Sequence, residues 1–221
     1  MTFEVQAHRA NSAAAIEAYL RVGPDSLELD VGVLADRTIV VSHEVRATTL
    51  ECPPGSPMLG TPWRDLAPED ARALGRPTLD DALALAGGTP LVVEAKVLPP
   101  ATLPSRAFAD ALEPHLGRIA LISFDAEVLA RARERMPTLS TTFLFAEPVP
   151  VAAGHTTVGP RADLVTRELV DQAHALGMRV VPWTVNEERA MRALIELGVD
   201  GIGTDEPALL RSVLSARGAA P

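Results

Sequence analysis

Two short stretches of the 221-residue sequence carry charged side chains at alternate positions. Glu28 and Asp30 are separated by one leucine, and Glu94 and Lys96 by one alanine. Because successive side chains of a β-strand point to opposite faces, each pair shares one face of its strand. Carboxylate oxygens without thiolates are the ligands that hard cations such as Mg²⁺ and Ca²⁺ prefer. The three carboxylates could therefore hold a divalent cation if their strands are neighbours.

The same charges have a second explanation within the protein. Charges that point into a protein interior are costly unless they are paired or bound to a metal. Lys96 could neutralise Glu28, Asp30 or Glu94 in a buried ion-pair network that needs no metal. By local pattern alone, the ion-pair network and the metal site explain these residues equally well.

Two of the five histidines could supply acid and base groups beside these carboxylates. His8 lies near the end of the β-like run 3–9, and His43 follows Asp30 by thirteen positions. A hairpin that turns at residues 35–37 would bring His43 back beside the carboxylates and near His8. An imidazole titrates close to neutral pH, so two histidines can act as general base and general acid. Taken singly, a histidine is more often a structural or surface residue, which is how we interpret the other three: His115, His155 and His174.

The elements that would position these residues alternate between short β runs and longer helical stretches. The eight principal β runs are expected at residues 3–9, 26–34, 90–96, 118–124, 139–145, 162–166, 178–185 and 199–203. The helices are expected at residues 11–22, 68–74, 77–88, 105–116, 126–135, 167–176, 187–197 and 207–215. Eight alternating β and α units with short connections predict a closed parallel (β/α)8 barrel of the TIM type. An open doubly wound sheet is the alternative, but its glycine-rich loop after the first strand is missing.

One β run falls outside this alternation. Residues 38–43 follow the second strand after only Ala35-Asp36-Arg37, which predicts a β-hairpin extension there. Proline- and glycine-rich residues 146–160 are expected to form a loop, as are residues 44–67. No change of composition marks a linker, so residues 1–221 are expected to form a single barrel domain. In such a barrel the functional residues gather at the C-terminal ends of the strands.

Composition narrows the class of protein. Twenty basic and 29 acidic side chains give a formal net charge of −9, which argues against a protein that coats nucleic acid or anionic membrane. No apolar run reaches the roughly 18–20 residues of a membrane span, and the N-terminus does not resemble a secretory signal. A single cysteine, Cys52, excludes an internal disulfide. We therefore expect a cytoplasmic protein without stable membrane insertion, whose oligomeric state the sequence does not indicate.

The candidate residues recur, in order, in one known family. Eight segments carry this recurrence: His8-Arg9, Glu28-Leu29-Asp30-Val31, Asp36 to His43, Pro77-Thr78-Leu79-Asp80, Val93-Glu94-Ala95-Lys96, Ser123-Phe124, Trp183-Thr184-Val185-Asn186, and Gly198 to Pro207. In these segments the chain resembles the glycerophosphodiester phosphodiesterases, (β/α)8 barrels of the phosphatidylinositol-phospholipase-C-like type. Any one of these short motifs would be weak, whereas their common order and spacing make the resemblance specific.

The resemblance implies metal-dependent hydrolysis of a glycerophosphodiester to glycerol phosphate and an alcohol. Glu28, Asp30 and Glu94 would hold one divalent cation, Mg²⁺ or Ca²⁺, which would bind phosphoryl oxygens. His8 and His43 would share the general acid and base roles, in an order that the sequence does not indicate. A vicinal hydroxyl of the substrate or a water molecule could attack, and the head group is open.

Three further residues gain roles from the resemblance. Arg9 and Lys96 would add positive charge around the phosphodiester, as catalytic and substrate-binding groups. Trp183 would offer an aromatic wall to the alcohol, although simple barrel packing would also explain it. The expected partner is thus a small-molecule phosphodiester.

The sequence also departs from the family, and two other functions follow from that. Ala10 stands where the family has glycine, its Pro-Glu-Asn-Thr segment has no counterpart, and Glu44 replaces an aspartate. Sphingomyelinase-D-type enzymes also tend to lack that segment and form cyclic phosphates from lysolipids, but those are secreted and disulfide-bearing. A catalytically silent barrel that binds a phosphorylated ligand is the other alternative, although it would have no reason to keep inward carboxylates beside two histidines.

Overall fold

The computed structural model describes all residues except 1, 49–51, 53, 97–109, 111 and 219–221. In this part of the chain, eight parallel strands pair in the order β8-β7-β6-β5-β4-β2-β1-β9. Their bounds are β1 Glu4–Ala7, β2 Ser26–Val33, β4 Leu91–Ala95, β5 Ile119–Ser123, β6 Ser140–Phe145, β7 Thr157–Pro160, β8 Arg179–Val180 and β9 Gly201–Thr204.

Backbone hydrogen bonds bridge the two ends of this strand order. The Asp200 N–H donates to the carbonyl of Val180 at 2.8 Å, and the Gly203 N–H donates to that of Pro182 at 2.9 Å. These bonds join the segment of β8 to that of β9 and leave the barrel nearly closed. The predicted α/β barrel with eight parallel strands is therefore confirmed.

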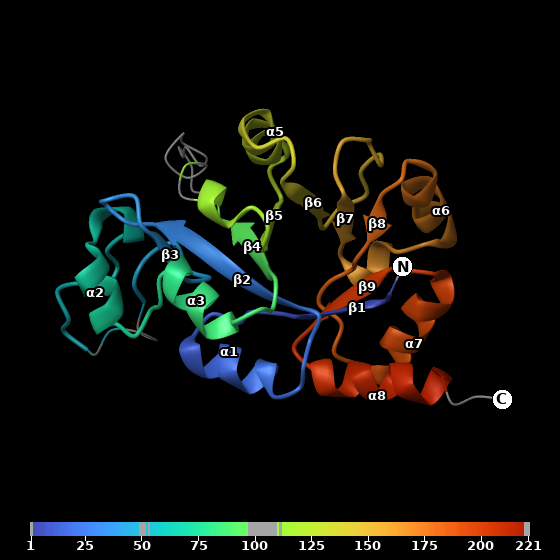
Figure 1. The fold of residues 1–221 in the computed structure, drawn as a ribbon, viewed down its shortest axis with the longest axis horizontal. Helices are drawn as coiled ribbons and strands as arrows, with labels where there is room; N and C mark the ends of the chain where they lie inside the picture. The colour runs from blue at the N-terminus through green and yellow to red at the C-terminus, as the bar shows by residue number, and fades with distance from the viewer. Residues whose placement is uncertain (1, 49–51, 53, 97–109, 111, 219–221) are drawn as a thin grey trace.

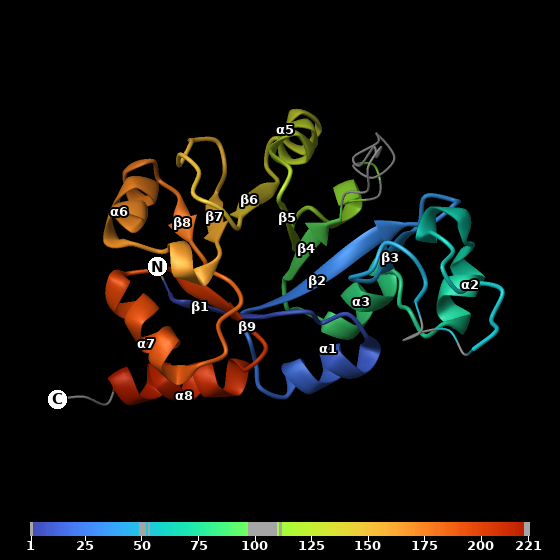
Figure 2. The ribbon, with the colours of Figure 1, turned by 180° about the vertical axis from the view of Figure 1, so that it is seen from behind.

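Helices surround the strands on the outside (Figures 1 and 2). The described helices are α1 Ala13–Leu20, α2 Pro68–Ala73, α3 Leu79–Ala86, α5 Ala126–Arg135, α6 Arg167–Ala175, α7 Glu188–Leu197 and α8 Pro207–Gly218. Four of them begin at side chains that accept a hydrogen bond from the first turn, as N-caps do: Ser12, Thr78, Asp125 and Thr166.

The core beneath these helices decides which way β2 faces. Leu27, Leu29 and Val31 are fully buried in a cluster that includes Ile16 of α1 and Leu83 of α3. These apolar side chains occupy the helix-covered exterior of the sheet. The alternate side chains of β2 therefore point into the barrel, as the alternation of strand faces predicts.

The hairpin after the second strand also forms. β3 spans Ile39–Val41 and pairs antiparallel with β2, with Val31 opposite Val41. Its turn contains Arg37 at φ +79°, and the Thr38 N–H donates to Asp36 Oδ1 at 2.9 Å. Such an Asx hydrogen bond favours a tight reversal, which returns the chain toward the barrel mouth.

Strand β7 lies within residues 146–160, which were expected to form a loop. The expectation of a strand over residues 162–166 is wrong. β7 spans Thr157–Pro160, whereas Ala162–Leu164 form a 3-10 turn. Gly159 and Pro160 are loop signals in a local reading of the sequence. Here Gly159 pairs with Leu144 of β6, and a Cβ on Gly159 would lie 2.6 Å from Leu144 Cδ2, so a larger residue would force that side chain to move.

Two other expected elements differ in extent. The regular part of the strand expected over 178–185 is limited to Arg179–Val180. Half of the helix expected over 105–116 lies outside the described residues, and Glu113–His115 form a 3-10 turn. Neither difference moves the residues that were expected to form the site.

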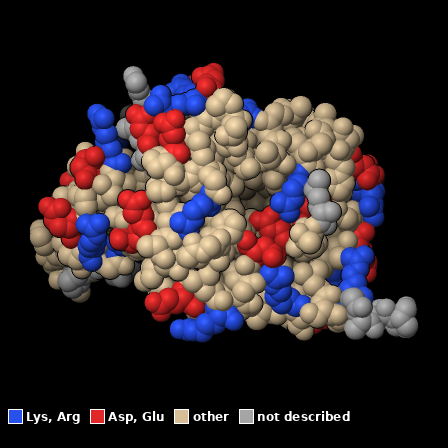
Figure 3. Space-filling model, viewed as in Figure 1, with Lys and Arg blue, Asp and Glu red and all other residues tan. Residues whose placement is uncertain are grey.

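Helix length and the distribution of surface charge indicate how the protein could contact a membrane. In the described part of the chain, no helix combines the length and apolar character that a membrane crossing requires. Figure 3 shows acidic and basic side chains interspersed over one face, without an extended basic patch on that face.

Candidate active site

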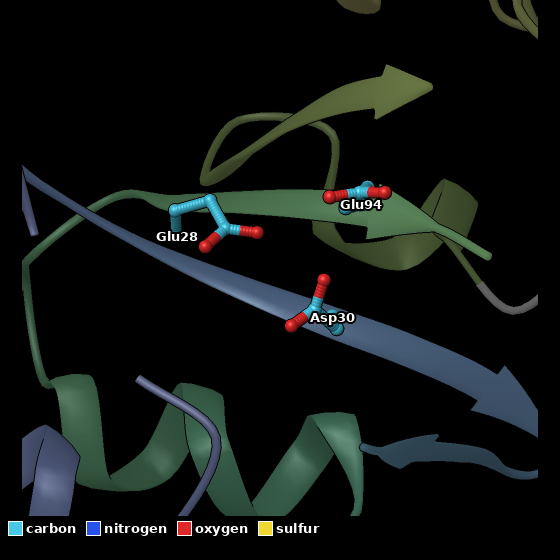
Figure 4. Close-up of side chains that lie close together, drawn as sticks. All are labelled: Glu28, Asp30 and Glu94. Atoms are coloured by element: carbon cyan, nitrogen blue, oxygen red, sulfur yellow. The ribbon is translucent and has the colours of Figure 1, made fainter. Parts of the chain in front are cut away.

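Three carboxylates converge inside the mouth of the barrel (Figure 4). Glu28 and Asp30 project from β2 and Glu94 from β4, and the strand register pairs Asp30 with Glu94. One oxygen of each lies within 4.8 Å of the others. The three side chains are buried. Two distant stretches of sequence thus form one acidic cluster, which could hold a metal ion.

Glu28 has fewer partners within the protein than the other two carboxylates, because Lys96 pairs with Asp30 and Glu94. Its Oε2 accepts the Arg9 N–H at 2.8 Å, but its buried Oε1 has no hydrogen-bond partner. Burial, together with the charges of Asp30 and Glu94, raises the pKa of Glu28 well above its ordinary range. Burial also raises the pKa of Glu94. A buried carboxylate oxygen without a donor is rare, and a bound cation would satisfy it.

Lys96 neutralises part of this charge. Its Nζ lies 2.8 Å from Asp30 Oδ1 and 2.6 Å from Glu94 Oε1. Burial favours the neutral amine, but the two carboxylates outweigh burial and raise the pKa of Lys96. Burial would raise the pKa of Asp30, whereas Lys96 and Asn11 bring it below its ordinary range. The ion-pair network considered above therefore exists, yet with all three carboxylates ionised one ammonium group would leave two negative charges. A hard divalent cation would neutralise that excess.

His8 follows β1 directly and is oriented by an aspartate from the other end of the chain. Its Nδ1 lies 2.8 Å from Asp205 Oδ1, which follows β9. The amide of Asn186 donates to Asp205 Oδ2 at 2.7 Å and accepts the Asp205 N–H at 2.9 Å. The carboxylate assigns the proton to Nδ1, so Nε2 is the acceptor; it accepts the Thr184 hydroxyl at 3.4 Å and lies 4.0 Å from Glu28 Oε2. Burial outweighs Asp205 and lowers the pKa of His8, which favours the neutral ring.

His43 reaches the same cavity from the hairpin. Its Nε2 lies 2.9 Å from Nη2 of Arg9, and its Nδ1 lies 3.0 Å from Glu44 Oε1. Because a guanidinium only donates, Nε2 is the acceptor and Nδ1–H donates to Glu44. Arg9 has a left-handed backbone, at φ +56°, which turns the chain immediately after His8.

One cavity of about 850 Å³ contains every residue that was expected to act. It is lined by His8, Arg9, Glu28, Asp30, His43, Glu94, Lys96 and Trp183, among others. The indole N–H of Trp183 donates to the carbonyl of Gly159 at 2.7 Å. Its ring meets Phe124 edge to face, with centroids 5.3 Å apart, and Phe124 is 46% exposed. The other three histidines are not among the residues that line this cavity.

The sequence reasoning gave no role to two residues that shape the site, Asp205 and Asn186, which hold His8. Both had a detectable signal, since each is a polar residue at the C-terminal end of a barrel strand or just beyond it. Asn11, for which the sequence suggests a polar contact near the site, contacts Asp30, and the turn at Arg9 brings it there.

Comparison with known proteins identifies the family. The family model for glycerophosphoryl diester phosphodiesterases matches residues 5–209. The chain belongs to the glycerophosphoryl diester phosphodiesterase family. It is 25% identical to a glycerophosphodiester phosphodiesterase of Caldanaerobacter subterraneus subsp. tengcongensis, over 94% of this chain and 93% of that protein. The enzyme class that the sequence predicted, a phosphoric diester hydrolase, is confirmed.

Solved structures share the fold of this chain. One from Silicibacter pomeroyi, named for the same family, is 24% identical with a TM-score of 0.87 and covers 98% of this chain and 94% of its own. A phosphodiesterase of Oleispira antarctica, solved with the product sn-glycerol-3-phosphate, is 18% identical with a TM-score of 0.78. That match covers 95% of this chain and 96% of the other. At these identities the likeness establishes the barrel architecture alone.

Proposed function

We propose that this protein hydrolyses a glycerophosphodiester to glycerol phosphate and an alcohol, with one divalent cation, Mg²⁺ or Ca²⁺. The observation that carries the proposal is the single cavity that joins the acidic cluster to two imidazoles and two basic side chains. Family membership supports the reaction type. The product bound to the Oleispira antarctica relative supports a small phosphodiester as the substrate.

Glu28, Asp30 and Glu94 would hold the cation. The donor set, the unpartnered Oε1 of Glu28 and the two uncompensated charges all support this assignment. A bound cation supplies electrostatic stabilisation of the charge that grows on the phosphoryl oxygens in the transition state. Lys96 would contact the phosphoryl group as a point charge, and Arg9 as a planar fork with two donors.

The two histidines would divide the proton transfers. His8 would act as general base through Nε2 and take the proton of the attacking hydroxyl, while Asp205 stabilises the imidazolium that forms. His43 would act as general acid and protonate the departing alkoxide through Nε2. In this assignment Arg9 leaves Nε2 of His43 to bind the phosphoryl group, and the hydrogen bond from Nδ1–H to Glu44 orients the ring.

Two aromatic rings would form the wall of the alcohol subsite. Trp183 lines the cavity, and its edge-to-face contact with the half-exposed Phe124 extends an apolar surface toward solvent. Such a surface would contact the carbon skeleton of the leaving alcohol. The indole is fixed by its hydrogen bond to Gly159, so it would offer a constant face to different alcohols.

A panel of glycerophosphodiesters tests the function. The full chain is assayed with Mg²⁺, Ca²⁺ and Mn²⁺ in turn, and products are identified by phosphorus NMR. We expect linear glycerol phosphate as the final product, with turnover only when a divalent cation is present. A cyclic phosphate as the end product would favour the sphingomyelinase-D-type reaction. Calorimetric binding of the diesters without turnover under any condition would favour the silent barrel.

Asp205→Asn is expected to lower kcat by about 10²–10⁴-fold, because the amide no longer fixes the tautomer of His8. Asp205 raises the pKa of His8, so its removal lowers that pKa further. A base acts when neutral, so the acid limb of the kcat/KM profile moves to lower pH in this variant. The pH dependence of kcat/KM checks both effects.

A second His–Asp pair provides the control for this variant. His174 Nε2 lies 2.8 Å from Asp200 Oδ2, and neither residue lines the cavity. Asp200→Asn therefore leaves the pH profile unchanged. An unaltered profile in Asp205→Asn, or an equal change in both variants, would contradict a role for Asp205 in orienting His8.

A further inference from the structure

Asn11 makes an unusual two-point contact with one metal-ligand candidate. Its Nδ2 donates to Asp30 Oδ2 at 2.6 Å, and its Oδ1 accepts the backbone N–H of Asp30 at 2.8 Å. Asp30 is 1% exposed, so both groups would otherwise be buried polar groups in need of partners. Because both bonds come from one amide, a rotation of the Asn11 side chain would break them together.

The backbone around Asn11 is itself fixed. The Ala10 N–H donates to the carbonyl of Glu28 at 2.7 Å, and the Asn11 N–H donates to that of Arg9 at 2.7 Å. The guanidinium of Arg76 donates to the carbonyl of Asn11 at 3.2 Å. The segment thus lies against β2, and this holds the Asn11 side-chain amide in place beside Asp30.

The two oxygens of Asp30 have different kinds of partner. Oδ1 faces the ammonium of Lys96 at 2.8 Å, and Oδ2 is engaged by the neutral amide of Asn11. A divalent cation at the acidic cluster would repel Lys96 and take its place at Oδ1. The amide carries no charge, so nothing would drive it from Oδ2 when a cation enters.

We propose that Asn11 is a positioning residue that holds Asp30 with Oδ1 turned toward the cation. The proposal rests on the metal site of the proposed function and adds to it a residue that touches neither the cation nor the substrate. Partners behind a metal ligand fix its orientation, and their loss typically weakens metal binding by about 10–100-fold. Asn11 lies in the segment in which this sequence departs from its family, next to Ala10.

Calorimetric titration of the metal-free full chain with Mg²⁺ or Ca²⁺ alone tests the proposal. We expect one ion to bind the wild type, and binding about 10–100-fold weaker in Asn11→Ala. Asn11→Gln, which keeps an amide but places it one methylene farther out, is expected to lose the two-point geometry and to bind weakly as well. If either variant does not fold, the other still decides the result.

Ser12→Ala is the matched control, because it alters the neighbouring residue without touching Asp30. Ser12 Oγ accepts the Ala15 N–H at 3.1 Å and caps α1, so its loss lowers the melting temperature but leaves the metal affinity unchanged. Wild-type affinity in Asn11→Ala or Asn11→Gln would overturn the proposal for Asn11 alone. A wild type that binds neither ion would overturn the metal site, and the proposal would fail with it.

Discussion

His8→Ala and His43→Ala are each expected to lower kcat by about 10²–10⁴-fold, the usual contribution of a general base or acid. His8 has its acceptor Nε2 beside the acidic cluster and a pKa lowered by burial, which suits a base. His43 enters from the hairpin, where its Nδ1–H donates to Glu44 and orients the ring in the cavity. Removal of His8 leaves no acceptor for the proton of the attacking hydroxyl, and removal of His43 leaves no donor for the departing alkoxide.

The leaving group separates the two roles. A glycerophosphodiester of 4-nitrophenol releases an anion that departs without a proton. On this substrate His43→Ala should recover most of its loss in kcat, whereas His8→Ala should not. His115→Ala is the control, since His115 pairs with the exposed Asp80 and does not line the cavity. Recovery in His8→Ala rather than His43→Ala would reverse the assignment, and wild-type rates in both variants would refute it.

Glu28→Gln is expected to move stability and metal binding in opposite directions. The substitution removes a buried carboxylate whose pKa burial has raised, so the metal-free variant should have a higher free energy of unfolding than the metal-free wild type. It also removes one of three anionic ligands, so affinity for Mg²⁺ or Ca²⁺ should fall by more than about 100-fold, beyond the effect of losing a partner behind a ligand.

Calorimetry and thermal unfolding, each with and without the cation, measure these two effects. Glu17→Gln is the matched control, because Glu17 is an exposed residue of α1. It should change neither quantity. A Glu28→Gln variant that binds the cation with wild-type affinity would contradict the assignment of Glu28, whatever its stability.

The acidic cluster could be predicted because its cause is local. Alternation along β2 places Leu27 and Leu29 under the helices and the carboxylates inside, and the same rule acts on β4. The order of βα units then makes these strands neighbours. The return of His43 followed from a short turn with an aspartate, which is also a local signal.

The missed features depend on contacts between distant residues. His8 and Asp205 are 197 positions apart, and they meet because β1 and β9 pair. Gly159 has the local character of a turn residue, and only its pairing with Leu144 of the neighbouring strand places it in β7. The reach of Asn11 to Asp30 requires the left-handed backbone at Arg9, which is uncommon for a residue other than glycine.

Turnover of a glycerophosphodiester by the metal-stripped protein, as a divalent cation is added back, tests the account most directly. The acidic cluster offers one site, so activity should be absent in chelator, rise with added cation, and saturate when calorimetry shows one ion bound per chain. Full hydrolysis by the stripped protein in excess chelator would contradict the role given to Glu28, Asp30 and Glu94.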